Sequence, residues 1–182
     1  MSKIRGFEPV MNHKTHAENV EIKLPIRSTK TACGYDFYMP VDVDIPPQAT
    51  VKVMTDIKAY MQDGEGLFFF PRSSTGIKHD LMLSNSVGIG ESDFYNNEGN
   101  EGNYCIALRN LRPAFELNGY NEYDIPGVGN IQIPIIKDLR EQNTVHIKAG
   151  DRLVQGIFIQ TLPADNCNSD AVRTGGIGST GA

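Results

Sequence analysis

The chain has 182 residues, and its 17 lysines and arginines against 22 aspartates and glutamates give a formal net charge of −5. A chain of this length is typical of one domain and buries about two thirds of its unfolded surface. With 40% hydrophobic and 21% charged residues, the composition excludes a collagen, a coiled coil and wholesale disorder. We therefore expect a single folded domain over residues 1–182.

The same counts disfavour three further classes of protein. No apolar run approaches the roughly 18 residues that cross a bilayer, and the amino terminus lacks a hydrophobic signal core, so we expect a cytoplasmic protein without membrane contact. The three cysteines, at positions 33, 105 and 167, form no CxxC pair, which favours reduced structural thiols over disulfides or a zinc knuckle. Net acidity without a Lys/Arg cluster argues against direct nucleic-acid binding.

Short segments that alternate apolar and polar side chains, separated by glycines and prolines, dominate the chain. A period of two is that of a half-buried strand. In chain order, strands are expected at residues 20–24, 41–45, 51–53, 67–70, 104–108, 131–136, 144–147 and 153–160. Many short strands with turns between them favour an all-β sandwich or barrel.

Helix is scarce in this pattern. One or two turns are expected at residues 73–78, with weaker candidates near Phe115 and Asp138. Because βαβ units need a helix between successive strands, a doubly wound nucleotide-binding fold is disfavoured. The Gly-, Pro- and Asn-rich stretch at about 112–143 predicts an inserted hairpin or loop excursion. The glycine-rich tail at about 171–182 can bury little, so we expect it to be mobile when nothing is bound.

The segment Pro71–Gly76 places an arginine and three hydroxyls directly after the apolar strand at 67–70. A strand that gives way to a helix start presents free N–H groups, and an arginine adds a bidentate fork, so oxyanions suit this place. The alternative is an N-capping serine beside a surface arginine.

The segment Asn85–Tyr95 combines glycines, acidic residues and aromatic rings. Its glycines suggest a hairpin or bulge where the backbone can approach a ligand closely. Glu91 and Asp93 are two residues apart and would share one face of a strand, where a carboxylate near a phosphate could activate water or hold a metal. The alternative is a pair of solvated turn acids.

The tail segment Gly176–Gly181 satisfies GxGxxG, but it lacks the following helix and acidic residue of a dinucleotide site. Ala182 stands where a Walker A loop needs lysine, so that motif fails as well. Consecutive glycines with Ser179 and Thr180 could still wrap an anion through backbone N–H groups. The alternative is an unstructured tail.

These segments, together with Cys33–Tyr38 and Gly150–Gln155, occur in one order that resembles the trimeric dUTP diphosphatases, the dUTPase family. The five segments match the family's five motifs from Cys33 to Gly181, which makes their joint occurrence specific although each is weak alone. The resemblance implies a distorted β jelly roll and a homotrimer with active sites shared between subunits. It also implies Mg²⁺-assisted hydrolysis of dUTP to dUMP and pyrophosphate by attack of water on the α-phosphorus. That reaction limits uracil incorporation into DNA and supplies dUMP for dTMP synthesis.

The resemblance further assigns roles to individual residues. Asp36 would hold Mg²⁺ through coordinated water, which suits an ion that keeps its waters, and Glu91 would activate the attacking water. The phosphates would contact Arg72, Ser73, Ser74 and Gln155 and, from a neighbouring subunit, Arg173, Gly178, Ser179 and Thr180, with Ile177 at the position that faces uracil. The hairpin would read the base through the main chain at Asn85, Gly88, Ile89 and Gly90, and Phe94 would lie against the deoxyribose.

Three positions depart from the family pattern. Glu91 replaces the usual aspartate, and one added methylene moves the carboxylate by roughly 1 Å, a displacement that can cost about 10²-fold in rate. Gly90 replaces the usual aliphatic residue before it. Ile177 stands where an aromatic ring is usual, and Arg173 is one residue nearer to it than in the common pattern.

These departures leave a second hypothesis, a trimeric dUTP-binding regulatory protein with weak catalysis. A third, dCTP deaminase, shares the family's fold, but the ordered motifs, especially Gly150–Gln155, favour the dUTP branch. Tyr120 and Tyr123 in the 112–143 insertion could pack a hairpin or meet a protein partner.

Overall fold

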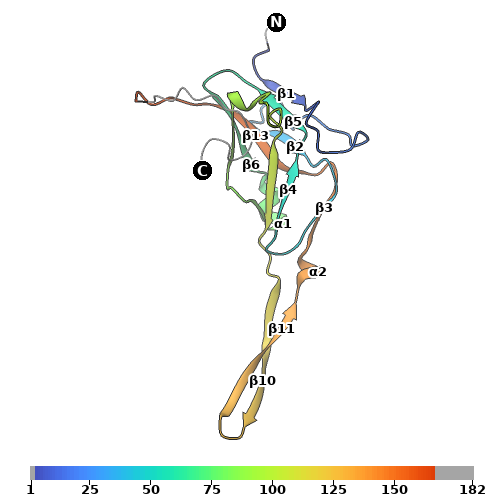
Figure 1. The fold of residues 1–182 in the computed structure, drawn as a ribbon, viewed down its shortest axis with the longest axis vertical. Helices are drawn as coiled ribbons and strands as arrows, with labels where there is room; N and C mark the ends of the chain where they lie inside the picture. Colours follow the sequence, from blue (N-terminus) through green and yellow to red (C-terminus); the bar gives the residue numbers. More distant parts are fainter. Residues whose placement is uncertain (1–2, 167–182) are drawn as a thin grey trace.

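The computed structural model describes residues 3–166, whose regular structure is mostly β-strand (Figure 1). The strands are β1 (Gly6–Pro9), β2 (Tyr35–Tyr38), β3 (Val43–Ile45), β4 (Thr50–Met54), β5 (Ile57–Tyr60), β6 (Glu65–Pro71), β7 (Leu81–Leu83), β8 (Gly88–Glu91), β9 (Cys105–Asn110), β10 (Phe115–Ile125), β11 (Gly129–Asp138), β12 (Val145–Ile147) and β13 (Arg152–Gln160). The helices are α1 (Ser73–His79), the 3₁₀ turn η1 (Ser92–Phe94) and α2 (Arg140–Asn143). The all-β fold predicted from the sequence is confirmed. No helix within residues 3–166 is long and apolar enough to cross a membrane.

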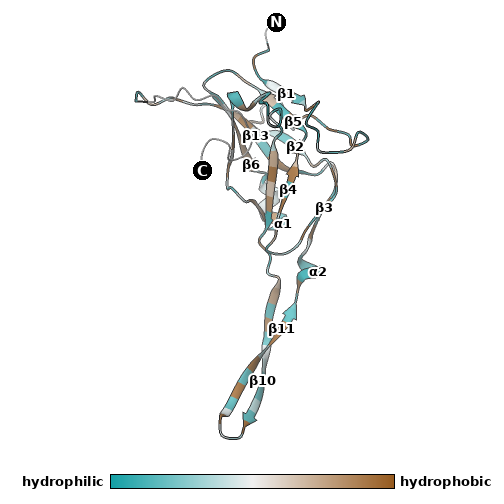
Figure 2. Cartoon of the chain, in the orientation of Figure 1, coloured by the Kyte–Doolittle hydropathy of each residue, from teal (hydrophilic) through white to brown (hydrophobic). Residues whose placement is uncertain are grey.

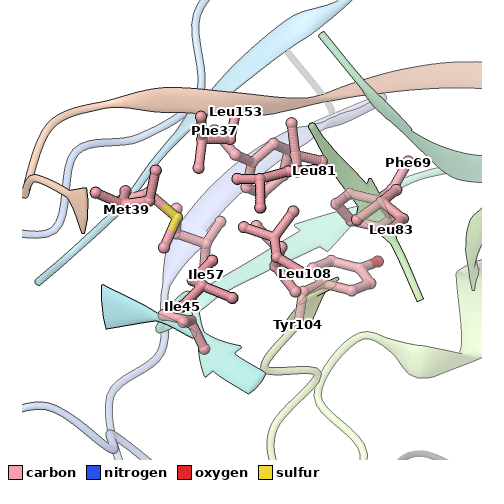
Figure 3. Packing of buried hydrophobic residues seen from close by; sticks show 14 of the residues in the cluster. Phe37, Met39, Ile45, Ile57, Phe69, Leu81, Leu83, Tyr104, Leu108 and Leu153 are labelled. Carbon is pink, nitrogen blue, oxygen red and sulfur yellow. The ribbon is translucent and has the colours of Figure 1, made fainter. Parts of the chain in front are cut away.

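Antiparallel pairing organises the strands into one four-stranded sheet, β2-β13-β6-β8, and one three-stranded sheet, β4-β9-β7. Three further pairs, β1-β5, β3-β12 and β10-β11, complete the described fold. The buried cluster draws side chains from both larger sheets, such as Phe37 and Phe69 from one and Leu81 and Leu108 from the other (Figure 3). The core therefore joins the two sheets.

Every expected strand except the first overlaps an observed strand. The strand predicted at residues 20–24 is wrong: the segment pairs with no neighbour and instead lines a cavity of about 380 Å³. Alternation predicts which side chains face inward, whereas a strand also needs an open edge to pair with. Strands β1, β2, β5 and β7 were not predicted, because strands that are short or buried on both faces lack clear alternation. Strands β8 and β10 lie where the sequence predicted a hairpin, with a bulge or a loop as the alternative.

The helix predicted at residues 73–78 is confirmed as α1, and the candidate near Asp138 corresponds to α2. The helical candidate near Phe115 is wrong, because Phe115 begins strand β10. Strand β11 pairs with β10 along the whole hairpin, from Phe115 opposite Asp138 at the base to Ile125 opposite Gly129 at the tip. The register shifts once, between Leu117 and Tyr120. Local alternation in the long hairpin outweighs the helical signal.

The β10–β11 hairpin projects away from the body of the molecule (Figure 1). All eleven residues of β10 are exposed, and apolar and polar residues mix along both strands (Figure 2). The hairpin leaves and re-enters the body at one place, where the backbone N–H of Leu139 donates to the carbonyl of Ala114 at 2.9 Å.

Candidate functional site

Asp36 lies at the centre of a charged cluster on the four-stranded sheet. Its side chain is buried, with the whole residue 3% exposed. Nε of Arg72 lies 3.0 Å from Oδ1 of Asp36, and Nη1 of Arg152 donates to Oδ2 at 3.2 Å. A buried carboxylate is stable only with such partners, because desolvation of an unpaired charge costs several kcal/mol. One carboxylate between two guanidinium groups leaves an excess of positive charge at this place.

The strand register brings these charged groups together. On β13, Gln155 is level with Asp36 of β2 on one side and with Phe70 of β6 on the other. Arg152 begins β13, and Arg72 follows the end of β6, where its backbone N–H donates to the carbonyl of Leu153 at 2.8 Å. Three segments that are far apart in the sequence therefore meet at one end of the sheet.

Gly34 makes room for the side chain of Gln155. A Cβ at Gly34 would lie 2.2 Å from Oε1 of Gln155, closer than any real contact. The amide nitrogen of Gln155 donates to the carbonyl of Pro71 at 3.5 Å. The glycine in the Cys33–Tyr38 segment thus allows Gln155 to lie across the chain beside the charged cluster.

Ser73 and Ser74 follow Arg72 in the first turn of α1. Arg72 itself is the extended N-cap residue of this helix. Thr75 is fully buried, and its Oγ1 donates to the carbonyl of Leu153 at 2.5 Å, which fixes α1 against β13. The structure therefore places the predicted phosphate-binding residues Arg72, Ser73 and Ser74 together with Asp36 and Gln155.

The segment from Asn85 to Gly90 forms the loop between β7 and β8 and most of β8 itself. Ser86 adopts a left-handed conformation with φ of 62°, and its N–H donates to the carbonyl of Leu83 at 3.0 Å. Ile89 is exposed although it is apolar. Because β8 is an edge strand of the described sheet, one side of its backbone faces outward, where N–H and C=O groups can pair with a ligand or another chain.

Glu91 ends β8 and is exposed, level with Gly66 of β6. Asp36 lies at the opposite edge of the same sheet, three strand spacings away, and level with Phe70 rather than Gly66. Strand geometry puts the two backbone positions about 19 Å apart. One chain therefore does not bring the two predicted carboxylates together.

Phe94, in η1, is buried in this chain, and its ring packs against that of Tyr104 with centroids 5.1 Å apart. The loop that follows is held by a buried ion pair, since Nζ of Lys58 lies 2.5 Å from Oε1 of Glu101. Burial alone would raise the pKa of Glu101, but hydrogen bonds from Lys58 and from the backbone N–H groups of residues 11 and 12 outweigh it and lower the pKa to about 2.

Two residues of the described site were not assigned roles from the sequence. Arg152 is the second partner of Asp36, and it lies within the Gly150–Gln155 motif that the sequence analysis had singled out. Tyr104, which packs against Phe94, had no motif to mark it. The predicted residues Arg173, Ile177, Gly178, Ser179 and Thr180 lie outside the described residues.

The donor set of the cluster fits one kind of metal. Within residues 3–166, no group of three or more His, Cys, Asp and Glu side chains could hold an ion directly. A cation beside Asp36 would take most of its oxygen ligands from water and from a bound phosphate. Mg²⁺ is commonly held in that way, whereas structural zinc takes four protein ligands. Because both oxygens of Asp36 already face guanidinium groups, a hydrated ion such as Mg²⁺ would be held here only through its waters.

Comparisons with known proteins agree with this fold and identify the family. A sequence model of the dUTPase family matches residues 20–99. A deoxyuridine 5'-triphosphate nucleotidohydrolase of Lactococcus lactis subsp. lactis is 37% identical over 182 residues, which cover 99% of each chain. The crystal structure of a dUTPase from Streptococcus mutans is 35% identical, with a TM-score of 0.64 over 88% of this chain and 99% of that chain.

A variant of the dUTPase from phage phi11 of Staphylococcus aureus, in which a structural Mg(II) ion is coordinated, has a TM-score of 0.61 at 20% identity. It covers 93% of this chain and 98% of that chain, and at this identity the likeness concerns the fold alone. Together with the Streptococcus mutans structure, it confirms the distorted jelly roll expected from the resemblance.

Proposed function

Because this chain belongs to the dUTPase family, we propose that it hydrolyses dUTP to dUMP and pyrophosphate by attack of water on the α-phosphorus. The observation that carries the proposal is the buried Asp36 between Arg72 and Arg152, with Gln155 beside it. This cluster combines excess positive charge with one carboxylate. Such a combination suits a triphosphate that arrives with a hydrated divalent cation.

Each group of the cluster has a distinct task in this proposal. Mg²⁺, when bound, neutralises charge on the triphosphate oxygens. Asp36 orients the waters of the ion and, through its two ion pairs, holds both guanidinium forks in place. Arg72 donates bidentately to phosphate oxygens, while Ser73 and Ser74 add hydroxyl donors and Gln155 a neutral amide.

Glu91 accepts the proton of the attacking water. Its carboxylate is exposed at the end of β8, where a bound water can reach it. The outward edge of β8 and its loop read the uracil edge, which offers an acceptor, a donor and an acceptor in order. Cytosine presents a different order and is mispaired. Phe94, which is 7% exposed in this chain, meets the deoxyribose only with the edge that Tyr104 leaves open, and a ring there leaves no room for a 2′-hydroxyl.

We propose that each active site combines two or more subunits of a homotrimer. The support is the separation of about 19 Å between Asp36 and Glu91 within one chain, estimated from strand spacing and register. A water activated by Glu91 must reach the phosphate that binds at the Asp36 cluster. Glu91 of one protomer therefore works with the Asp36 cluster of another, and residues 173–180 of a neighbouring protomer close over the substrate.

A mixing experiment tests the shared site. Asp36→Asn and Glu91→Gln should each be inactive alone, and trimers reassembled from an equal mixture should regain dUTP hydrolysis, because some sites receive both intact residues. A mixture that exchanges subunits but stays inactive would contradict a shared site.

Pyrophosphate release from dUTP, dCTP, dTTP and UTP with Mg²⁺ tests the activity itself. We expect the turnover of dUTP to exceed that of dCTP, dTTP and UTP by at least about 10²-fold, because a site that recognises the base through hydrogen bonds rejects bases that cannot form them. Glu91→Gln should abolish turnover, and Glu98→Gln, an exposed carboxylate seven residues further on, is the matched control. Equal turnover of all four nucleotides, or ammonia release from dCTP, would refute the proposal.

The hairpin of β10 and β11 has a separate role, which we propose is contact with a protein partner. Tyr123, Ile131 and Ile133 share one face of its outer half, and Glu122 and Gln132 share the other, joined by a hydrogen bond of 2.8 Å. Replacing residues 115–138 by Asn-Gly between Ala114 and Leu139 should leave dUTP turnover within about twofold. A larger loss would assign the hairpin to the active site. The cytoplasmic location and the absence of nucleic-acid contact stay predictions.

A further inference from the structure

Gly90, the residue before Glu91, lies buried against an aromatic ring. A Cβ at Gly90 would lie 2.5 Å from Cε1 and 2.6 Å from Oη of Tyr104. Real side chains do not approach so closely, so the ring occupies the space into which a side chain at position 90 would project. Glycine fits here because the ring of Tyr104 lies so close to the backbone, and an aliphatic residue at this position would have to displace the ring.

The same ring packs against two other aromatic side chains. Its centroid lies 5.1 Å from that of Phe94 and 4.9 Å from that of Phe69, and Tyr104 is 6% exposed. Phe69 in turn meets Phe37 at 5.1 Å. Figure 3 shows Tyr104, Phe69 and Phe37 within one buried cluster. A column of four rings therefore runs from Phe37, the neighbour of Asp36, to Phe94.

Tyr104 thus contacts both β8, at Gly90, and η1, at Phe94. It precedes strand β9, which is anchored between β4 and β7 in the other sheet. Close-packed interiors transmit displacements instead of absorbing them, so a change in this ring moves both neighbours together.

We propose that Tyr104 is a positioning residue that sets the backbone of Gly90 and Glu91 and the ring of Phe94 in one fixed relation. Its ring fills the space that a side chain at position 90 would occupy. It thereby couples water activation at Glu91 to discrimination of the sugar at Phe94. This inference rests on the proposed function, from which the roles of Glu91 and Phe94 are taken.

The test compares kcat and KM for dUTP and UTP among variants of the full chain. Tyr104→Leu should lower kcat for dUTP by about tenfold or more, since displacements near 1 Å have costs on that scale. It should also reduce the preference for dUTP over UTP in kcat/KM by about tenfold, because removal of the ring releases Phe94. Tyr104→Phe, which keeps the ring, should retain kcat and the preference within about twofold.

A second pair of variants keeps the inference testable if Tyr104→Leu does not fold. Gly90→Ile should lose turnover because its side chain collides with the ring. Adding Tyr104→Ala to Gly90→Ile should recover part of that turnover, because the isoleucine then fills the vacated space. A double variant no more active than Gly90→Ile would overturn the inference.

Ile147→Ala is the matched control for a cavity in the core, because Ile147 is equally buried on β12. It should lower the melting temperature and leave the preference for dUTP over UTP unchanged. An unchanged preference in Tyr104→Leu, or equal losses in Tyr104→Phe and Tyr104→Leu, would refute the positioning role. If the unsubstituted chain does not hydrolyse dUTP, the proposed function fails instead, and the two failures are distinguishable.

Discussion

Strands β6 and β11 have similar apolar content and opposite surroundings. In β6, Leu67 is 0% exposed, because β13 and β8 pair with this strand on both edges and a second sheet covers its face. In β11, Ile133 is 48% exposed, because β11 has one partner strand and no part of residues 3–166 covers the hairpin. An apolar pattern therefore predicts a strand, but burial requires a second layer. The two-layered body therefore holds the buried core, and the hairpin adds little to it, in line with the separate role proposed for it.

The largest expected effect lies in the ion pair behind Phe94. Lys58→Met would leave the carboxylate of Glu101 buried without its cation, and breaking a buried pair costs about 3–5 kcal/mol of unfolding free energy. Chemical denaturation measures the loss. The exposed pair of Lys148 and Asp42 is the matched control, and Lys148→Met should cost no more than about 1 kcal/mol. Equal losses in both variants would contradict the distinction between core and surface.

A somewhat smaller effect concerns catalysis at the charged cluster. Asp36→Asn removes the carboxylate between Arg72 and Arg152, so the two guanidinium groups lose their shared anchor and the cation loses its outer partner. We expect dUTP turnover to fall by about 10²-fold or more. Asp42→Asn, a surface substitution six residues away, should leave turnover unchanged. If Asp36→Asn retained its turnover of dUTP, the charged cluster would not be part of the active site.

The pKa of Glu101 predicts a pH dependence of the core. Its folded pKa is lowered from 4.5 to about 2, so its contribution to stability is present above pH 4.5 and is lost as the pH falls toward 2. The unfolding free energy of the unsubstituted chain should therefore decline below pH 4.5 more steeply than that of Glu101→Gln. Parallel curves for the two proteins, measured by denaturant titration, would show that Glu101 does not carry this dependence.

The smallest effect is expected in the hairpin. Ile133→Thr should change the unfolding free energy by less than about 0.5 kcal/mol, because its side chain is exposed. Ile45→Ala, at a fully buried position, should cost about 2–5 kcal/mol. A large loss in Ile133→Thr would mean that another surface covers the hairpin in the assembled protein.

Sequence reasoning recovered the parts of the fold that alternation encodes. The strand at 153–160 was found because its pattern is long, whereas residues 20–24 alternate equally well and pair with nothing. Which segments find a partner edge depends on the whole topology. The hairpin's apolar side chains were likewise visible in the sequence, but their exposure was not.

For the site, the motif order singled out Asp36, Arg72 and Gln155, and the structure brings these three residues together, while their roles stay predictions. The contact between Arg152 and Asp36 was not predicted, because it follows from the register of β13 against β2. Gly90 stood out as a departure from the family pattern, but the sequence did not indicate that the ring of Tyr104 fills its place. A glycine marks a close approach without identifying the group that approaches.

Hydrogen bonds join the two ends of the excursion at the base of the hairpin, from Leu139 to Ala114 and from Asn143 to Pro113, and they affect how this chain can vary. The inserted hairpin is therefore a loop whose two ends are already held together where it joins the body. The entropy of closing such a loop grows only with the logarithm of its length, so doubling the excursion costs about 0.6 kcal/mol. This position can therefore accept inserts of different length and sequence while the catalytic body stays the same.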